Sequence, residues 1–246
     1  MTYPSRLDPV WALLPVKTFT AAKSRLSGCL SPDQRIALQQ AMLADVLTAA
    51  NRARSLDGVA VVTRDPVAAG FVRRFGAHVV AEAHVGAEEA GGCDLNRALA
   101  DGVRGLRAMG AARALVVPAD IPFLDPAEID AAVALARGAR APVAVPSRDR
   151  GGTNGLVVRL DRPFGFTFGA DSFRRHLANP AQGPVMPAAL PSFALDVDLP
   201  ADLAALRRRL PAGIRGGVIP GLPPCPAAHT ALWLAEARPC VREHQT

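Results

Sequence analysis

Short apolar runs alternate with amphipathic segments along the first half of the chain, and this alternation limits the possible folds more than any other feature. The runs lie at residues 10–16, 58–63, 78–83 and 114–118, and each has the length of a buried strand. The run Ala114-Leu115-Val116-Val117 is apolar throughout, which is typical of parallel strands that helices cover on both faces. The sequence therefore predicts right-handed βαβ units and a three-layer α/β/α sandwich with a mostly parallel sheet.

The segments between these runs carry the signals of helices. Ser31 can cap the first helix, and Pro32 suits its first turn. Ile36, Leu43 and Leu47 then recur at helical spacing. Further helices are expected at residues 66–75 and 95–109.

The second half of the chain is less regular. The expected elements are strands at residues 142–146, 156–160 and 193–198, a turn at 148–154, and helices that open near residue 171 and span 200–210. The last helix would bury Ala201, Leu203, Ala204 and Leu206. Residues 1–210 are thus predicted to form one domain. Residues 211–246 contain six prolines and little apolar periodicity, which predicts a tail that is partly disordered or folded loosely over the surface.

The charge balance suggests a polyanionic partner at first sight. The chain has 28 basic and 22 acidic residues, a formal net charge of +6 and a sequence pI near 9.9. The arginines are spread along the chain in pairs typical of solvated helix faces, and aromatic residues make up only 5% of it. We therefore expect no nucleic-acid partner.

The cysteines and the hydropathy pattern indicate a cytoplasmic protein. The cysteines at positions 29, 93, 225 and 240 form no CxxC pair, so neither a zinc site nor a redox motif is suggested. No apolar stretch reaches the about 20 residues that a membrane-spanning helix needs. The first nine residues also lack the charged head and apolar run of a secretory signal.

Three cations follow the first predicted strand. In an open α/β sheet the ligand lies outside the carboxyl ends of the strands, so Lys17, Lys23 and Arg25 can reach one edge of a cleft. There they could hold a triphosphate by charge, because this loop has no glycine-rich phosphate cradle. A lysine after a strand can also be merely solvated, and the loop alone does not decide between the two interpretations.

Acidic residues follow other predicted strands. Asp120 ends a buried strand and precedes Ile121-Pro122, which stiffens the backbone, and Mg²⁺ prefers one or two such carboxylates together with substrate phosphates. Asp120 could instead cap a turn, although Asp125 is better placed to cap the next helix. Asp196 and Asp198 alternate along a predicted strand and would share a face, so one of them could complete a metal site.

Two glycine-containing loops are candidates for binding a small anion. Residues 151–155 combine three glycines with the hydroxyl of Thr153 and the amide of Asn154, although a plain turn would look the same. Gly169 and Ser172 lie at the start of a predicted helix, where Asp171 could act as a cap instead. We interpret the nearby His176 as a structural or surface residue rather than a proton shuttle.

The chain resembles the guanylyltransferases of coenzyme F(420) biosynthesis, which activate a phosphorylated short carboxylic acid with GTP. The resemblance covers about residues 10–210. It rests on these stretches of the sequence: Leu14-Pro15-Val16-Lys17, Ala22-Lys23-Ser24-Arg25-Leu26, Ala41-Met42-Leu43-Ala44-Asp45-Val46-Leu47, Pro118-Ala119-Asp120-Ile121-Pro122, Gly152-Thr153-Asn154, Phe168-Gly169-Ala170-Asp171-Ser172-Phe173, and Asp196-Val197-Asp198-Leu199-Pro200-Ala201-Asp202-Leu203.

This similarity implies a fold of the nucleotide-diphospho-sugar transferase type, which is glycosyltransferase-A-like. It also implies that Asp120 and Asp198 bind Mg²⁺ and that the acid lies against Gly155, Gly169 and Ser172. Family members carry threonine or alanine at the first of these positions, so glycine removes a side-chain contact there. Hydrogen bonding at that point would come only from the backbone or from the neighbouring Thr153 and Asn154.

The implied reaction is attack of a phosphate-monoester oxygen on the α-phosphorus of GTP, with release of pyrophosphate. The second pKa of a phosphate monoester is about 6, so the attacking oxygen needs no general base at neutral pH. Lys17, Lys23 and Arg25 would neutralise the triphosphate. The sequence does not choose among 2-phospho-L-lactate, phosphoenolpyruvate and 3-phospho-D-glycerate, and it leaves open whether the chain is a homodimer.

Two alternatives remain at this point. The nearer one is a related nucleotidyltransferase that acts on a sugar phosphate or on the molybdopterin cofactor. Such enzymes usually have a glycine-rich loop after the first strand, whereas this chain has no glycine before Gly28. The other alternative is a non-catalytic nucleotide- or RNA-binding module, which only the positive charge suggests.

Overall fold

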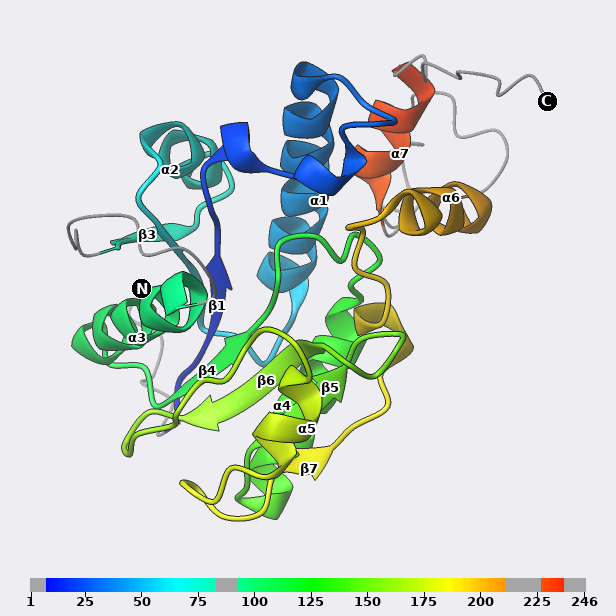
Figure 1. The fold of residues 1–246 in the computed structure, drawn as a ribbon. Helices are drawn as coiled ribbons and strands as arrows, with labels where there is room; N and C mark the ends of the chain where they lie inside the picture. The colour runs from blue at the N-terminus through cyan, green and yellow to red at the C-terminus, as the bar shows by residue number, and fades with distance from the viewer. Residues whose placement is uncertain (1–7, 83–92, 211–226, 237–246) are drawn as a thin grey trace.

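A seven-stranded sheet forms the centre of the computed structural model, which describes residues 8–82, 93–210 and 227–236 (Figure 1). The strands are β1 (Val10–Pro15), β2 (Gly58–Thr63), β3 (His78–Ala81), β4 (Arg113–Val116), β5 (Val143–Pro146), β6 (Thr153–Arg159) and β7 (Met186–Pro187). Their order is β3-β2-β1-β4-β6-β5-β7. β6 runs antiparallel to β4 and β5, and the other neighbouring pairs are parallel. The predicted, mostly parallel sheet is confirmed.

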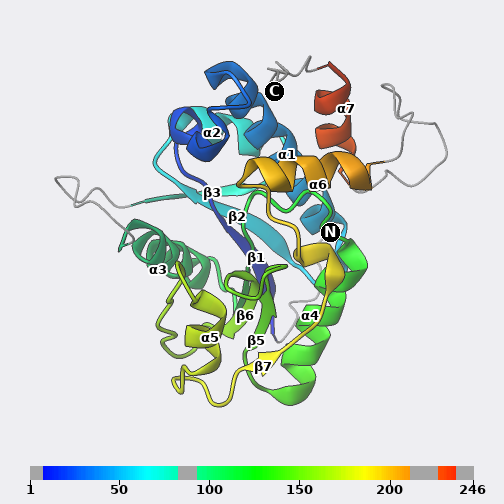
Figure 2. The same ribbon diagram turned by 45° about the vertical axis from the view of Figure 1, so that its right-hand side comes forward.

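Helices cover both faces of this sheet. They are α1 (Pro32–Arg52), α2 (Pro66–Arg73), α3 (Cys93–Ala108), α4 (Pro126–Ala139), α5 (Ser172–Leu177), α6 (Pro200–Arg209) and α7 (Ala228–Glu236), with 3-10 helices η1 (Phe19–Ala21), η2 (Ser24–Leu26) and η3 (Pro191–Phe193). Figure 2 shows α3 and α5 on one side of the strands and α1 and α4 on the other. None of the helices in the described ranges is long and apolar enough to cross a membrane.

The strands bury side chains on both of their faces. Leu13 and Val116 belong to the apolar cluster under α3 and α5. Leu14 and Leu115, their neighbours along the chain, belong to the cluster under α1, α2 and α4. Successive side chains of a strand point to opposite faces, so two covered faces require apolar residues at every position. The unbroken apolar runs of the sequence are therefore the consequence of three layers.

Polar side chains mark where several helices begin. Ser31 accepts a hydrogen bond from the backbone N–H of Gln34 at 3.2 Å, and the Gln34 side chain accepts one from Ser31 N–H at 2.9 Å, which makes a capping box. Asp125 caps α4 through the N–H of Ala127, as its place before Pro126 indicates. Asp171 makes no such side-chain cap on α5.

Two expected elements differ from the structure. β6 begins at Thr153 rather than at residue 156, because Pro146 of β5 already pairs with Thr153 and the turn is confined to the residues between them. The strand expected at residues 193–198 is absent: η3 ends at Phe193, and the segment that follows is held by single hydrogen bonds, such as that from Val197 N–H to Asp120 O at 3.1 Å. A strand needs a continuous ladder, which this segment lacks.

Helix α6 matches the predicted range, but its buried side is different. Leu203 and Leu206 are buried as expected, whereas Ala201 is exposed and Asp202 is buried. The Asp202 carboxylate accepts hydrogen bonds from Leu199 N–H at 2.8 Å and from Arg148 at 2.7 Å. These hydrogen bonds at the helix start compensate for the burial of the Asp202 carboxylate. The first turn of α6 therefore points Asp202 inward rather than Ala201.

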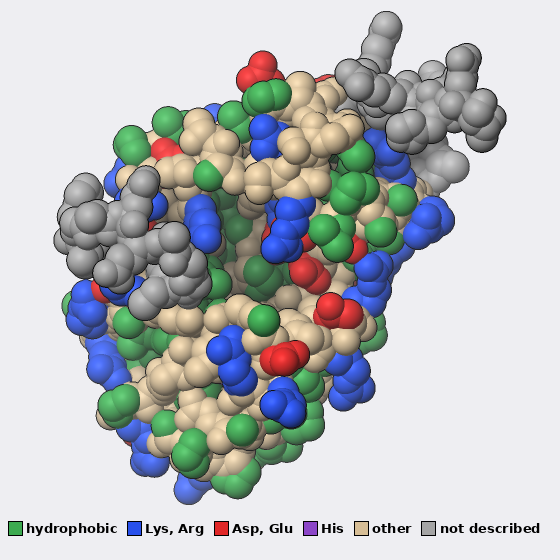
Figure 3. Space-filling model, in the orientation of Figure 1, with side chains coloured by type: hydrophobic (Ala, Val, Ile, Leu, Met, Phe, Trp, Pro, Cys, Tyr) green, Lys and Arg blue, Asp and Glu red, His purple; other side chains and the backbone are tan. Residues whose placement is uncertain are grey.

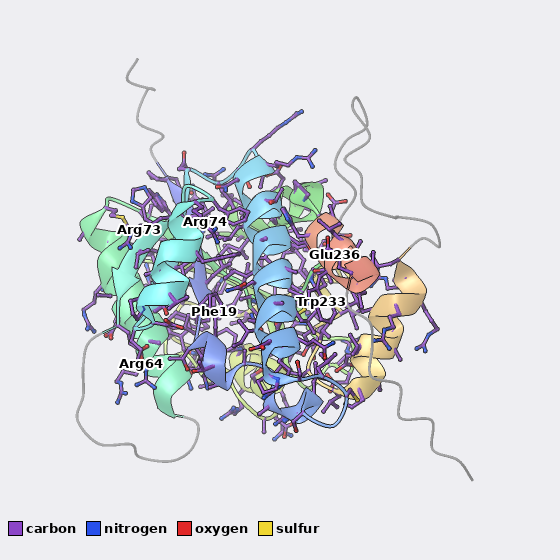
Figure 4. The ribbon with its side chains drawn as sticks, turned by 90° about the horizontal axis from the view of Figure 1, so that it is seen from above. Phe19, Arg64, Arg73, Arg74, Trp233 and Glu236 are labelled. Atoms are coloured by element: carbon purple, nitrogen blue, oxygen red, sulfur yellow. The ribbon has the colours of Figure 1, made fainter. Side chains whose placement is uncertain are left out.

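Part of the predicted tail is a packed helix. α7 lies alongside α1, and Figure 4 shows Trp233 and Glu236 on it. The buried carboxylate of Asp45 on α1 accepts hydrogen bonds from the N–H groups of His229 and Thr230 at 2.8 and 2.9 Å and from the Thr230 hydroxyl at 2.6 Å. A carboxylate on one helix therefore caps the start of another, so residues 227–236 form a packed part of the segment that was expected to be partly disordered or loosely folded. The remainder of the predicted tail lies outside the described residues.

Replacing Asp45 with alanine should detach α7 from α1. The change leaves three donors at the α7 N-terminus without their acceptor, so we expect a loss of about 1–3 kcal/mol in the free energy of unfolding. Urea unfolding measures this loss, and hydrogen exchange at residues 228–236 locates it. Glu236→Gln, an exposed charge removal on the same helix, should leave both unchanged. Equal protection of α7 in D45A and the unaltered protein would contradict the capping role.

Candidate active site

Lys23 lies between two carboxylates at the carboxyl ends of the central strands. Its Nζ atom is 2.6 Å from Asp120 Oδ2 and 2.7 Å from Asp198 Oδ1, and its side chain is only 4% exposed. Burial alone would lower the pKa of Lys23, but the charges of Asp120 and Asp198 and the hydrogen bonds to them outweigh it, so the pKa is raised. Three residues from distant parts of the chain thus form one charged cluster.

One apolar cluster anchors all three segments that carry these residues. Leu26, Phe123 and Val197 are buried together beneath α6, and each lies within three residues of Lys23, Asp120 or Asp198. Burial of these side chains fixes the backbone on which the charged groups stand. The geometry of the charged cluster therefore depends on packing that the charged residues do not take part in.

The backbone at Lys23 is strained. Lys23 has a φ of 53° and a ψ of 39°, the left-handed region, directly before η2. Such a conformation costs a non-glycine residue about 1 kcal/mol or more and tends to occur at functional sites. Arg35 on α1 donates a hydrogen bond to Ala22 O at 3.3 Å and holds the loop in place. The strained turn aims the lysine side chain inward at the two carboxylates.

Asp120 has one oxygen with a partner and one without. Its Oδ2 accepts from Lys23, whereas its Oδ1 is buried and has no hydrogen-bond partner among the described residues. A buried carboxylate oxygen without a donor is costly unless a ligand or an ion satisfies it. The free oxygen of Asp120 therefore marks a place for a cation or a donor that the described residues do not supply.

Asp196 and Asp198 both belong to the site, although the strand that was expected to carry them is absent. Burial is the largest single influence on the pKa of Asp198 and would raise it. The charges of Lys23 and Arg25 and the hydrogen bond to Lys23 together outweigh burial, so the pKa of Asp198 is lowered. Burial, and then the charge of Asp120, raises the pKa of Asp196. Asn154 donates a hydrogen bond to Asp196 Oδ1 at 3.1 Å. Asp196 is thus a third carboxylate at the site, and only its spacing from Asp198 indicated it.

The two remaining predicted cations are exposed. Arg25 Nη1 lies 3.8 Å from Asp198 Oδ2, and its side chain is 70% exposed. Lys17 directly follows β1, whose pairing extends to a hydrogen bond from Val16 N–H to Val62 O, and it forms no ion pair with a described residue. Both side chains are accessible to a ligand. Figure 3 shows acidic and basic side chains gathered beside a hollow on this face of the molecule.

Thr153, Ser172 and His176 form a buried hydrogen-bonded group. The N–H of Thr167 donates to His176 Nε2 at 3.1 Å, so Nδ1 carries the proton and donates to Thr153 Oγ1 at 2.9 Å. The Ser172 hydroxyl also donates to Thr153 Oγ1, at 3.3 Å. Burial, and then the charge of Arg175, lowers the pKa of His176 to about 4, so the ring is neutral at pH 7. These side chains join β6 to α5, and His176 is structural as expected.

The predicted acid-binding residues differ in accessibility. Thr153, Asn154 and Ser172 are 5%, 5% and 2% exposed, so their side chains first serve packing and hydrogen bonding inside the protein. Gly169 is exposed and has a φ of 119°, which only glycine adopts easily. A role for these residues in binding an acid stays a prediction.

Packing explains why residue 155 is glycine, and the sequence alone did not reveal this. A Cβ atom at this position would lie 2.9 Å from the ring of Phe193 and 3.1 Å from the side chain of Val145. The missing side chain therefore leaves room for Phe193, which is fully buried. Our interpretation that glycine removes a ligand contact is corrected: a side chain here would point into the core.

Replacing Gly155 with alanine should destabilise the protein by about 1–3 kcal/mol, because the new methyl group overpacks the contact with Phe193. Thermal and urea unfolding measure the effect. Gly151→Ala is the matched control, since its Cβ would meet nothing closer than 3.6 Å. A second change, Phe193→Leu in the Gly155→Ala background, should recover part of the loss. A G155A protein as stable as the unaltered one would refute this packing role.

Comparisons with known proteins agree in both sequence and fold. A family model described as "Guanylyl transferase CofC like" matches residues 10–207. A phosphoenolpyruvate guanylyltransferase of Conexibacter woesei is 43% identical over 225 residues, which cover 89% of this chain and 92% of the relative. A 2-phospho-L-lactate guanylyltransferase of Methanothermobacter thermautotrophicus is 34% identical over 188 residues, which cover 76% and 78%.

Solved structures share the fold at low sequence identity. A suspected nucleotide-diphospho-sugar transferase from Desulfovibrio desulfuricans has a TM-score of 0.69 and 17% identity, with 94% of this chain and 95% of that chain covered. A CMP:2-keto-3-deoxy-manno-octonic acid synthetase complexed with CTP has a TM-score of 0.52 and 17% identity, with 82% and 98% covered. The nucleotide-diphospho-sugar transferase fold predicted for the chain is confirmed.

Proposed function

The chain belongs to the CofC-like guanylyl transferase family, and we propose that it transfers GMP from GTP to the phosphate of a short phosphorylated carboxylic acid in coenzyme F(420) biosynthesis. The acceptor is phosphoenolpyruvate, 2-phospho-L-lactate or 3-phospho-D-glycerate. The observation that carries the proposal is the cluster of Lys23, Asp120 and Asp198, in which cationic and anionic groups meet at the carboxyl ends of the strands.

We propose that Asp120 and Asp198 hold Mg²⁺. The unpartnered Oδ1 of Asp120 and the oxygen-only donor set fit this hard cation, which takes one or two carboxylates and completes its shell with phosphates and water. In the described part of the chain no three acidic, histidine or cysteine side chains are placed to hold a metal alone, so substrate phosphates would have to complete the proposed site. The bound ion would neutralise charge on the triphosphate.

The protein's own groups would position the nucleotide and neutralise its charge. Lys23 is held between the two carboxylates, Arg25 is exposed 3.8 Å from Asp198, and Lys17 is exposed directly after β1. We expect these three cations to face the phosphates of GTP. The acceptor's phosphate oxygen bonds to the α-phosphorus as the bond to the β-phosphate oxygen breaks and pyrophosphate leaves. We expect no part for His176 in proton transfer, because both of its ring nitrogens are already hydrogen-bonded to Thr153 and Thr167, and a dianionic phosphate needs no base.

Pyrophosphate release, measured with GTP, Mg²⁺ and each of the three acids in turn, tests this function. We expect release with at least one acid, together with a guanylylated acid detected by mass spectrometry. Replacing GTP with CTP or ATP tests the base preference. If none of the three acids supports release while GTP still binds, the proposed acceptor class is wrong.

A further inference from the structure

A second cavity lies at the other end of the sheet from Asp120. It has a volume of about 540 Å³, within the range of about 300–1,000 Å³ typical of small-molecule sites. It opens where β1 and β4 begin and the antiparallel β6 ends. Four of its lining side chains are arginines: Arg107, Arg113, Arg140 and Arg159. We call it the arginine cavity.

Two aspartates form the ion pairs of four arginines in and around this cavity. Asp8 Oδ2 lies 2.7 Å from Arg113 Nε and 3.3 Å from Arg137 Nε. Asp161 Oδ1 accepts a hydrogen bond from Arg159 Nε at 3.0 Å and lies 4.0 Å from Arg162 Nε. Each carboxylate therefore neutralises one of its two arginines at most. Some of the positive charge at the cavity wall is therefore not neutralised by ion pairs.

Arg107 and Arg140 add to this excess. Arg107, in the last turn of α3, donates through Nε to the carbonyl oxygen of Leu160, and it forms no ion pair with a described residue. Arg140 ends α4 in the left-handed region, with a φ of 52°, and it also lacks an acidic partner among the described residues. Both side chains are on exposed residues. Six arginines thus gather around two carboxylates at one concave surface.

An apolar cavity of about 210 Å³ adjoins the arginine cavity. The two share Arg107, Arg159 and Leu160, and the smaller one is also lined by Phe164 and Phe166. A guanidinium group can pair with a phosphate through two parallel hydrogen bonds and can also stack on a planar ring. The shared arginines therefore lie between a region suited to phosphates and a region suited to a ring.

We propose that the arginine cavity is a second ligand site, which binds an oligophosphate anion. The ligand could be a free oligophosphate or the phosphate chain of a nucleotide, whose base would then enter the adjoining apolar cavity. The site is separate from the cluster of Lys23, Asp120 and Asp198, because the two lie at opposite ends of β1 and β4.

Isothermal titration calorimetry with pyrophosphate, in the presence of EDTA, tests the site. EDTA removes the divalent ions that could attach pyrophosphate to the acidic residues at the opposite edge. Arg107→Gln with Arg140→Gln should weaken binding at least about tenfold, since each lost arginine removes a charge-assisted hydrogen bond to phosphate. Gln removes the charge but keeps a polar side chain, and at position 140 it must adopt the same left-handed backbone as Arg140.

The matched control is Arg52→Gln with Arg73→Gln. These two exposed arginines also end helices, in the last turns of α1 and α2, and their removal changes the net charge by the same amount. We expect binding as in the unaltered protein. Equal weakening by both pairs, or no weakening by R107Q/R140Q, would overturn the proposal, because the binding would then reflect net charge or another site.

The same titrations with GTP distinguish the two sources of the phosphate chain. The comparison uses only the part of the binding that R107Q/R140Q removes, so nucleotide held at the other edge does not enter it. Tighter binding of GTP than of pyrophosphate supports the site with a nucleotide as occupant. Equal binding supports it with a free oligophosphate as occupant.

Discussion

Asp120→Asn is expected to abolish turnover while the fold stays intact. Asparagine keeps the size of the side chain and can still accept a hydrogen bond from Lys23, but it removes the charge that would hold Mg²⁺ and leaves Lys23 with one carboxylate instead of two. Loss of one preorganised electrostatic group in an active site costs about 100- to 1,000-fold in kcat, and we expect at least this here.

Pyrophosphate release measures the activity of this variant, and circular dichroism with thermal unfolding confirms its fold. Asp33→Asn, an exposed acid in the first turn of α1, is the control for a general effect of charge and should retain full activity. A D120N protein with near-normal turnover would remove Asp120 from the proposed metal site and with it the main support for the mechanism.

Lys23→Met should give the second large effect, on stability as well as on activity. The ammonium is buried between Asp120 and Asp198, and Asp196 lies close enough for Asp120 to affect its pKa. Without the ammonium these carboxylates repel one another. Breaking a buried ion pair costs about 3–5 kcal/mol, and we expect about 2–3 kcal/mol here because the carboxylates are partly exposed to water.

Mg²⁺ provides a test of this variant that does not depend on turnover. If Asp120 and Asp198 bind the ion, its addition should raise the melting temperature of K23M by more than that of the unaltered protein, because it supplies the missing positive charge. Arg25→Gln is the control, since its side chain is 70% exposed and its removal should change stability little. No preferential stabilisation of K23M by Mg²⁺ would contradict metal binding by these carboxylates.

Elements with local signals could be predicted closely. Ser31 and Pro32 mark the start of α1, and the predicted strand at residues 58–63 coincides with β2. Both rest on information within a few residues, namely a cap and an apolar run. The segment after Phe193 lacked such a signal: its alternation resembled a strand, but no neighbouring strand was available to pair with it.

The candidate site also combines features that a local rule predicts with contacts that it cannot predict. The rule that ligands bind at the carboxyl ends of parallel strands was sufficient to bring Lys23 and Asp120 together. The rule could not reveal that Gly155 makes room for Phe193 or that Asn154 holds Asp196, because both contacts join residues about 40 positions apart.

By itself the sequence determined the layered α/β architecture, the family resemblance and the identity of the charged residues, because apolar periodicity, caps and motifs are properties of neighbouring residues. Only the tertiary structure decided which of those residues meet. It placed Lys23 between two carboxylates, enclosed Thr153 and Ser172 in a hydrogen-bonded group with His176, and gathered arginines at the opposite end of the sheet. Such contacts depend on how helices and strands pack, and packing is set by the shapes of side chains that are distant in the chain.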